Sequence, residues 1–195
     1  MSGIGDKPLA RSLGWITRSR TTLHRSQWFD VHQDQIDLPN NKSCVYTFVD
    51  HPGAVFVVPV TPEGAIILLK SFRYTCDDWC IEVPAGGMGD QGEATAEQVV
   101  ATELREELGC EFSSLEHLST HWMANGYARN RSAFFLARDA VVTKPPSPES
   151  TELFAEPLTV PQEHARRMVR AGEINDGESA FAVMLALDWL RDHAD

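Results

Sequence analysis

The sequence predicts a single mixed α/β (α+β) domain. Two pairs of strand-like segments come first, a capped amphipathic helix follows a further strand, and two helical segments close the chain. The 195 residues, 43% of them hydrophobic, are enough to bury a full core without disulfides or metals holding it together. The sequence shows no internal repeat or domain linker. We therefore expect one domain over residues 23–195, preceded by a loosely held N-terminal arm over residues 1–22.

The strands are predicted from apolar or alternating segments that are separated by turn residues. Pro39-Asn40-Asn41 is turn-prone and joins the first pair of strands, and Pro62-Glu63-Gly64 joins the second pair. The second pair is hydrophobic almost throughout, which indicates strands that are covered on both faces. The strands expected in this way are residues 28–38, 44–49, 54–60, 65–70, 79–83, 115–122 and 131–137.

The central helix has sequence features that mark both of its ends. Thr95 followed by Gln98 is a capping box, which places the helix start near Ala96, and Gly109 is a natural C-terminal stop. An apolar stripe along this helix would bury one side of it. The stripe consists of Val100, Ala101, Leu104 and Leu108. Two more helices are expected at residues 161–171 and 179–193.

Three glutamates lie beside that stripe at helical spacing. Around the helix axis, Glu103 and Glu107 are about 40° apart, and Glu106 lies about 60° to the other side. Carboxylates this close repel one another by roughly a few tenths of a kcal/mol per pair. A hard divalent cation such as Mg²⁺, which prefers oxygen ligands, would turn that repulsion into coordination. The alternative from spacing alone is an ordinary solvated acidic face.

Charge and composition exclude several classes of function. The chain has 28 acidic and 17 basic residues, a net charge of −11, and no basic stripe, so we expect no nucleic-acid partner. No run of 18 or more apolar residues is present, so no membrane span is expected. The N-terminus lacks the apolar core of a signal peptide, which favours the cytoplasm. The four cysteines are too scattered for a disulfide framework, which indicates free thiols.

The segment that contains the three glutamates resembles the box of the Nudix family, G-x5-E-x7-R-E-U-x-E-E-x-G-U, where U is an aliphatic residue. Gly87 and Glu93 match its first half, and the sequence E-L-x-E-E-x-G from Glu103 onward matches its second half. There are two departures from the pattern. One extra residue lies in the loop near Ala94, and Thr102 occupies the position of the arginine that orients the glutamates in the family.

Further short motifs, in the right order over residues 25–190, resemble the ADP-ribose and nucleotide-sugar pyrophosphatase branch of that family. They are Phe72-Arg73-Tyr74, the WCIEVPAG segment 79–86, the segment 124–137 and the GEINDGES segment 172–179. The resemblance implies the Nudix fold, a mixed β-sheet between helices. It also implies that the chain hydrolyses the diphosphate linkage of ADP-ribose or another nucleoside diphosphate sugar, which yields a nucleoside monophosphate and a sugar phosphate.

The resemblance also implies a set of metal ligands. Glu103 and Glu107 would be the main ligands of a Mg²⁺ or Mn²⁺ ion, and the Ala85 carbonyl would complete the shell. Glu106 would assist, or coordinate the ion through water. Glu93 is a weaker candidate, because the extra residue beside it alters its reach.

A general base is missing from its usual place in this branch. Aligning Gly126 with the glycine of the family's S-P-G-x-S-D-E loop puts Asn130 at the glutamate position. An amide cannot accept a proton at neutral pH, so the base must come from elsewhere. Glu149 and Glu152, in the following acidic loop, are candidate substitutes, and catalysis without a side-chain base is the alternative.

Four residues outside the box are candidate substrate contacts. Arg73 would contact a phosphate, or else it is a surface arginine at a strand end. Trp28 would stack on a base, or else it belongs to the core or to a dimer interface. Arg129 and Arg131 would hold a phosphate or a sugar, or else they are solvated loop arginines.

Two hypotheses about function remain open at this point. The first is a metal-dependent pyrophosphatase that acts on a small nucleoside diphosphate substrate. The second is a Nudix-fold binding or sensing module for nucleotide sugars that has lost efficient catalysis, which Thr102 and Asn130 favour. Relatives in this branch are often homodimers, so the N-terminal hairpin, residues 23–50, is a candidate homodimer interface.

Overall fold

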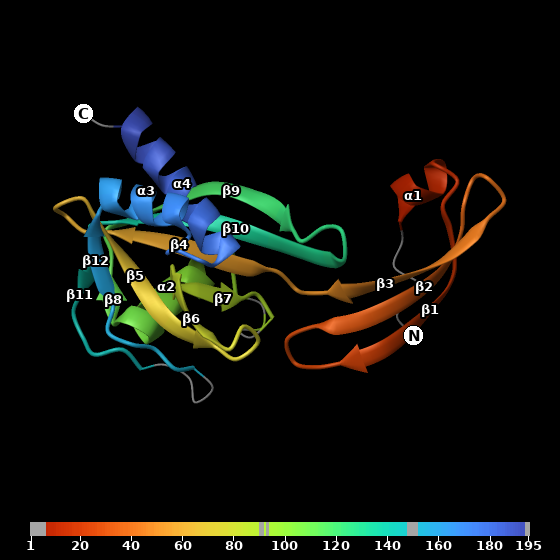
Figure 1. The fold of residues 1–195 in the computed structure, drawn as a ribbon, viewed down its shortest axis with the longest axis horizontal. Helices are drawn as coiled ribbons and strands as arrows, with labels where there is room; N and C mark the ends of the chain where they lie inside the picture. Colours follow the sequence, from red (N-terminus) through yellow and green to blue (C-terminus); the bar gives the residue numbers. More distant parts are fainter. Residues whose placement is uncertain (1–6, 90–91, 93, 148–151, 194–195) are drawn as a thin grey trace. The chain divides into compact units, whose positions relative to one another are not determined.

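The computed structural model describes residues 7–89, 92, 94–147 and 152–193 (Figure 1). The chain divides into two compact units. The first consists of residues 1–52 and 122–131, and the second of residues 53–121 and 132–195. Each unit is described by itself.

The second unit is built on a mixed sheet in the order β10-β4-β5-β12. Strand β10 runs parallel to β4, whereas β5 runs antiparallel to β4, and three further strands pair with this path: β6 with β5, β7 with β4 and β9 with β10. A two-stranded sheet, β8 with β11, lies apart from it. The strands are β4 (Ala54–Val60), β5 (Ala65–Arg73), β6 (Asp78–Glu82), β7 (Ala85–Gly87), β8 (Cys110–Glu111), β9 (Ser114–Met123), β10 (Ala128–Arg138), β11 (Val141–Val142) and β12 (Leu158–Pro161).

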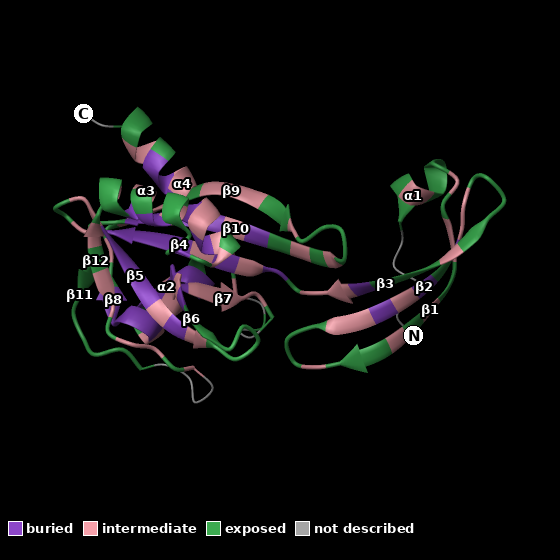
Figure 2. Cartoon of the chain, viewed as in Figure 1, coloured by how far each residue is buried: buried purple, intermediate pink, exposed green. Residues whose placement is uncertain are grey.

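Helices cover both faces of this sheet. Helix α2 (Ala96–Leu108) packs on one face of β4, and α4 (Gly177–Asp192) packs on the other, beside α3 (Gln162–Ala171) (Figure 1). The burial pattern agrees, because β4 and β5 are buried along most of their length (Figure 2). The expected mixed sheet between helices is therefore confirmed.

Each face of the sheet has its own core. On the α2 face, Leu104 and Leu108 pack with Val57 and Phe135, all of them fully or almost fully buried. On the α4 face, Phe134 stacks on Phe56 with ring centroids 5.5 Å apart and meets Phe181 edge-on at 5.1 Å. Burial of one such side chain contributes about 1.5–3 kcal/mol. The apolar stripe expected for the helix is thus the surface that fixes α2 to the sheet.

Helix α2 begins and ends where its sequence features indicate. The Thr95 hydroxyl accepts a hydrogen bond from the Gln98 N–H, and the Gln98 side chain accepts one from the Thr95 N–H, at 3.3 and 2.8 Å. Gly109 ends the helix in the left-handed conformation, with φ 60°. A Cβ at this position would overlap the Lys144 carbonyl, so only glycine fits. The predicted capping box and C-terminal stop are both confirmed.

The first unit is an antiparallel meander with a short helix beside it. It contains α1 (Pro8–Ser12), β1 (Ile16–Arg25), β2 (Asp30–Asp37) and β3 (Ser43–Asp50), and the first residues of β10 pair with β3. Its centre is partly polar, since Asp34 is fully buried and accepts hydrogen bonds from Arg20 at 2.7 and 2.8 Å and from Lys7 at 3.1 Å.

The loosely held arm expected over residues 1–22 is not what the described part of that stretch shows. Strand β1 pairs with β2 along its length, and Arg20 holds it to the buried Asp34 carboxylate. The stretch is rich in arginine and threonine, so it lacks the apolar pattern by which strands are found in a sequence. The ion pair with a strand further along the chain accounts for its order.

No helix in the described residues is long and apolar enough to cross a membrane. The four cysteines are free thiols. Burial raises the pKa of the Cys110 thiol to about 11.

Candidate active site

The site lies where α2 faces β7, within the second unit. Glu103 packs its side chain against Gly86, so closely that a Cβ at position 86 would overlap the carboxylate. One turn further along α2, Glu107 is only 3% exposed and accepts a hydrogen bond from the Ala85 main-chain N–H at 3.1 Å. Two of the predicted metal ligands therefore meet the Ala85-Gly86 backbone, Glu107 at Ala85 and Glu103 at Gly86.

Glu107 has an electrostatic environment that opposes its negative charge. Burial raises its pKa well above the usual value, and the charges of Glu103 and Glu152 raise it further. The hydrogen bond from Ala85 and the positive charge of Arg73 act in the opposite direction but do not balance these effects. Three carboxylates and one guanidinium thus act on one another at this place, although they come from three separate segments of the chain.

Arg73, at the end of β5, is held by Glu82 of β6. Its Nε donates to both carboxylate oxygens at 2.9 and 3.0 Å, and its Nη2 donates to one of them at 2.6 Å. The Glu82 hydrogen bonds raise the pKa of Arg73, which is therefore a permanent cation. The Arg73 side chain remains 48% exposed, and Nη1 takes no part in this pair.

A cavity of about 270 Å³ opens beside the pair. Arg73, Glu82 and Ala85 contribute to its wall, and so do Asn175 and Asp176 from the loop before α4. The cavity therefore shares the Arg73–Glu82 pair and Ala85 with the site, whereas the glutamates of α2 do not line it.

The other candidate residues of the second unit are less closely connected with Ala85 and Gly86. Glu106 is half-buried on α2, and its carbonyl accepts a hydrogen bond from the Ser147 N–H at 2.7 Å. Arg105, on the same helix, is exposed. Glu93 and Glu149 lie outside the described residues.

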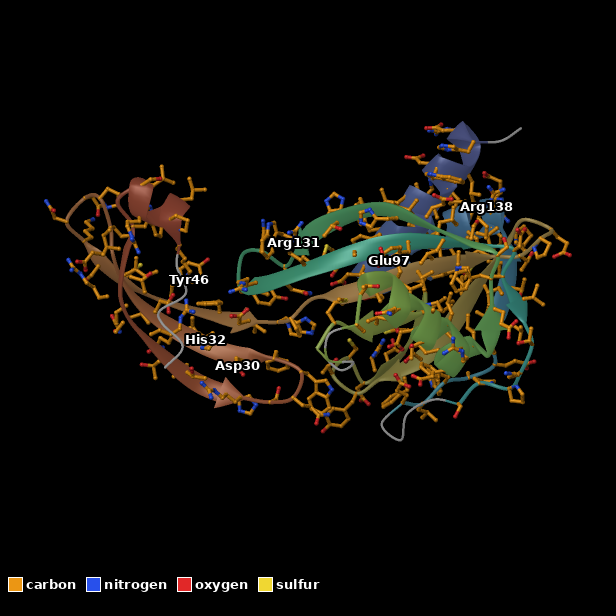
Figure 3. The ribbon with its side chains drawn as sticks, turned by 180° about the vertical axis from the view of Figure 1, so that it is seen from behind. Asp30, His32, Tyr46, Glu97, Arg131 and Arg138 are labelled. Atoms are coloured by element: carbon orange, nitrogen blue, oxygen red, sulfur yellow. The ribbon has the colours of Figure 1, made fainter. Side chains whose placement is uncertain are left out.

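Four candidates belong to the first unit. Trp28, in the turn between β1 and β2, is 51% exposed. Arg129 pairs with Asp50 at 3.4 Å, and Arg131 of β10 lies over the Trp122 ring, 5.4 Å from its centroid (Figure 3). The side-chain oxygen of Asn130 is buried without a hydrogen-bond partner.

The arrangement at Ala85 offers oxygen donors to a divalent cation. Among the described residues, no three His, Cys, Asp or Glu side chains form a ready-made metal site. What the chain offers instead is a pair of carboxylates, Glu103 and Glu107, beside the Ala85-Gly86 backbone, with no room for a side chain at position 86. Oxygen donors of this kind suit Mg²⁺ or Mn²⁺, and the unfavourable charge at Glu107 is what a bound cation would relieve.

Two features of the site were missed from the sequence. Glu82 lies in the WCIEVPAG segment, but no role was expected for it, although a charged residue in an otherwise apolar strand is an indication of pairing. Asn175 and Ser179 lie in the GEINDGES segment, but their bonds to β6 and to Val83 just after it were not expected, because no local pattern predicts side chains that reach a strand so far back in the chain.

The sequence matches the NUDIX domain family model over residues 50–180. The chain therefore belongs to the NUDIX domain family, and it is a hydrolase that acts on phosphorus-containing anhydrides. Its resemblance to the ADP-ribose pyrophosphatase branch is likewise confirmed.

Three comparisons place the chain within that family. The ADP-ribose pyrophosphatase of Bacillus subtilis (strain 168) is 31% identical over 175 residues, which cover 89% of this chain and 92% of the relative. The CMP-5'-(N-acetyl-N-hydroxy-3-aminopropyl)phosphonate hydrolase of Streptomyces rubellomurinus (strain ATCC 31215) is 27% identical over 173 residues, covering 89% and 82%. A crystal structure of an ADP compounds hydrolase matches the fold with a TM-score of 0.79 at 20% identity, covering 92% of this chain and 96% of the other.

Proposed function

We propose that this protein hydrolyses the diphosphate linkage of ADP-ribose or another nucleoside diphosphate sugar, with Mg²⁺ or Mn²⁺ as its cofactor. The products are a nucleoside monophosphate and a sugar phosphate. The observation that carries the proposal is the convergence of Glu103 and Glu107 on Ala85-Gly86, with Glu152 and Arg73 close enough to change the pKa of Glu107.

Each residue has a role that follows from its position. Glu103, Glu107 and the Ala85 carbonyl hold the cation, which when bound offsets charge on the diphosphate and lowers the pKa of the attacking water. Arg73, oriented by Glu82, binds a phosphate oxygen through the edge that Glu82 leaves uncovered. Its charge also offsets the glutamates, in part, where Thr102 replaces the arginine of the family box.

Glu152 is the proposed general base. Its charge raises the pKa of Glu107, which supports a place for Glu152 near the site, whereas Asn130 cannot accept a proton. Glu106 assists the two principal ligands, and Glu93 stays a weaker candidate. Trp28 stays a candidate for stacking on a base, and Arg129 and Arg131 stay candidates for holding a phosphate or a sugar.

The names of the relatives support the class of substrate but not the identity of its nucleobase. One is named for ADP-ribose and the other for a CMP conjugate, so both names describe a nucleoside monophosphate joined through phosphorus. The acidic chain supports a small anionic substrate rather than a nucleic acid, since it carries a net charge of −11.

Hydrolysis of a panel of nucleoside diphosphate sugars with Mg²⁺ or Mn²⁺, with products separated by chromatography, tests the proposal. We expect turnover of ADP-ribose or a close analogue. We expect Glu107→Gln to lower it about a hundredfold, because a principal ligand is lost. Glu97→Gln is the matched control, since Glu97 is exposed in the first turn of the same helix (Figure 3).

Two outcomes contradict different parts of the proposal. Full activity of Glu107→Gln would refute the metal assignment. Binding of nucleotide sugars by the unmodified protein without any turnover would mean that the chain binds these ligands but does not cleave them.

We also propose that the protein is a homodimer in which the N-terminal hairpin, residues 23–50, contributes to the interface. Leu23, Trp28 and Val45 are each more than half exposed on this hairpin, and apolar exposure of this kind is typical of a contact surface. Light scattering would give the mass in solution, and a monomer at micromolar concentration would contradict this proposal.

A further inference from the structure

Strand β6 has two edges, and within the described part of the chain only one of them pairs with a strand. Residues 78–82 pair with β5, from Asp78 opposite Arg73 to Glu82 opposite Leu69. Along a strand, alternate residues direct their N–H and C=O groups to opposite sides. The groups of Trp79, Ile81 and Val83 therefore point away from β5.

Two side chains from the far end of the chain bond to this second edge. The Asn175 carboxamide accepts a hydrogen bond from the Ile81 N–H at 2.9 Å and donates one to the Trp79 carbonyl at 3.3 Å. The Ser179 hydroxyl accepts one from the Val83 N–H at 3.1 Å. The carboxamide thus repeats the donor-acceptor pair that one residue of a neighbouring strand would offer.

Both side chains are themselves held in place. Asp176 caps α4 by accepting a hydrogen bond from the Ser179 N–H at 2.7 Å, and Ser179 is fully buried. Asn175 is the residue immediately before that cap, in the loop that connects α3 and α4. The Ser179 bond therefore starts from the first turn of a 16-residue helix, and the Asn175 bonds start from the residue just before the cap of that helix.

The strand that Asn175 and Ser179 hold leads directly into the active site. Glu82, which orients Arg73, lies between Ile81 and Val83, so the residues on both sides of it are held by hydrogen bonds from Asn175 and Ser179. Two residues after Val83, the Ala85 N–H bonds to Glu107. Any slip of β6 would displace the arginine pair and the Ala85 carbonyl together.

We propose that Asn175 and Ser179 are positioning residues for the hydrolysis. They act through β6, by keeping Glu82 and Ala85 in register with Arg73 and Glu107, and they need not contact the substrate. The inference rests on the proposed function for its catalytic consequence. Its structural consequence, the geometry of Ala85 toward a divalent cation, can be measured without turnover.

The experiment uses the full chain with Asn175→Ala, Asn175→Asp and Ser179→Ala. Asn175→Asp keeps the acceptor for Ile81 but loses the donor to Trp79. Gln162→Ala is the matched control, because Gln162 also reaches from a helix to a main-chain carbonyl, that of Gly64 at 2.9 Å, in a turn remote from the site. The readouts are kcat and KM for ADP-ribose, the melting temperature, and the Ala85 amide resonance during a Mg²⁺ titration.

We expect the Asn175→Ala and Ser179→Ala variants to lose about tenfold in kcat and in Mg²⁺ affinity. The Ala85 resonance should shift before any metal is added. Ser179→Thr keeps the hydroxyl and should restore the unmodified behaviour. Gln162→Ala should lower the melting temperature without changing kcat, Mg²⁺ affinity or the Ala85 resonance.

Two results would overturn the inference. One is a set of variants that melt earlier, as Gln162→Ala does, yet keep kcat and Mg²⁺ affinity within twofold. The other is an unchanged Ala85 resonance. If the unmodified protein cleaves no nucleotide sugar, the proposed function fails, but Mg²⁺ affinity and the Ala85 resonance still decide the positioning role. If Asn175→Ala does not fold, Asn175→Asp tests the Trp79 bond alone and Ser179→Ala tests the Val83 bond, and unchanged Mg²⁺ affinity and Ala85 resonance in both would overturn the inference.

Discussion

The Glu107 carboxylate accepts a hydrogen bond from the Ala85 main-chain N–H at 3.1 Å, which joins α2 to the first residue of β7. A helix and a strand that are 22 residues apart at this point therefore share one buried contact. Because Glu107 is almost completely buried beside other acidic groups, this contact favours a charged carboxylate in a place that otherwise disfavours charge.

The site should require a glycine at position 86. Gly86→Ala places a methyl group where the Glu103 carboxylate lies, so we expect a loss of about 1–3 kcal/mol in the free energy of unfolding. Mg²⁺ affinity should fall at the same time. Urea unfolding and calorimetric titration measure the two effects. Gly177→Ala is the control, because its Cβ would meet open space, and equal behaviour of the two variants would contradict the prediction.

Glu152 should act in the chemical step rather than in binding. We expect Glu152→Gln to lower kcat by about 10²–10⁴-fold with little change in KM, because the amide cannot accept a proton. Steady-state kinetics with ADP-ribose measures both constants. Glu156→Gln, an exposed change in the same segment, should leave them unaltered. An unchanged kcat in Glu152→Gln would mean that the base lies elsewhere.

The contribution of the Arg73–Glu82 pair to stability should be separable from the contribution of Arg73 to turnover. Arg73→Met leaves the Glu82 carboxylate, whose side chain is 7% exposed, without its partner. We expect this change to lower the free energy of unfolding by about 1–2 kcal/mol. The cost is smaller than for a fully buried pair, because Arg73 itself is half exposed. Adding Glu82→Gln removes the unpaired charge and should recover most of that stability. Turnover should stay low in the double variant, since the phosphate contact is still missing. Recovery of turnover would show that Arg73 serves only to pair with Glu82.

Asp34 should make the first unit sensitive to acid. Burial acts to raise the pKa of Asp34, but hydrogen bonds from Arg20 and Lys7 outweigh it and hold the pKa below the usual value of 3.8. A depressed folded-state pKa means that the stabilisation is fully present above the unfolded-state value, about 3.9, and is lost as the pH falls through the folded-state value.

Urea unfolding of the unmodified protein and Asp34→Asn between pH 7 and pH 2.5 measures this effect. The difference in unfolding free energy should be constant above about pH 5 and shrink below about pH 4. A difference independent of pH would contradict the prediction. Asp37→Asn removes an exposed pair with Arg18 and should change stability by less than about 1 kcal/mol.

Much of the fold could be predicted, because its information is local. The ends of α2 depend on Thr95, Gln98 and Gly109, each within a few residues of the bond or turn that it makes. The apolar runs of β4 and β5 reveal burial on both faces for the same reason. Strand β1 could not be found in this way, since its order depends on the pairing of Arg20 with Asp34 of another strand.

By itself, the sequence determined the family, the limits of the central helix and the set of glutamates on its acidic side. Only the tertiary structure decided that Glu107 is buried against Ala85, that Glu82 holds Arg73, and that Asn175 bonds to Ile81 across 94 residues of sequence. Helical spacing gives the direction of a side chain around its own axis but not what packs against it. That depends on which distant segments the two apolar cores bring to the ends of β5 and β6.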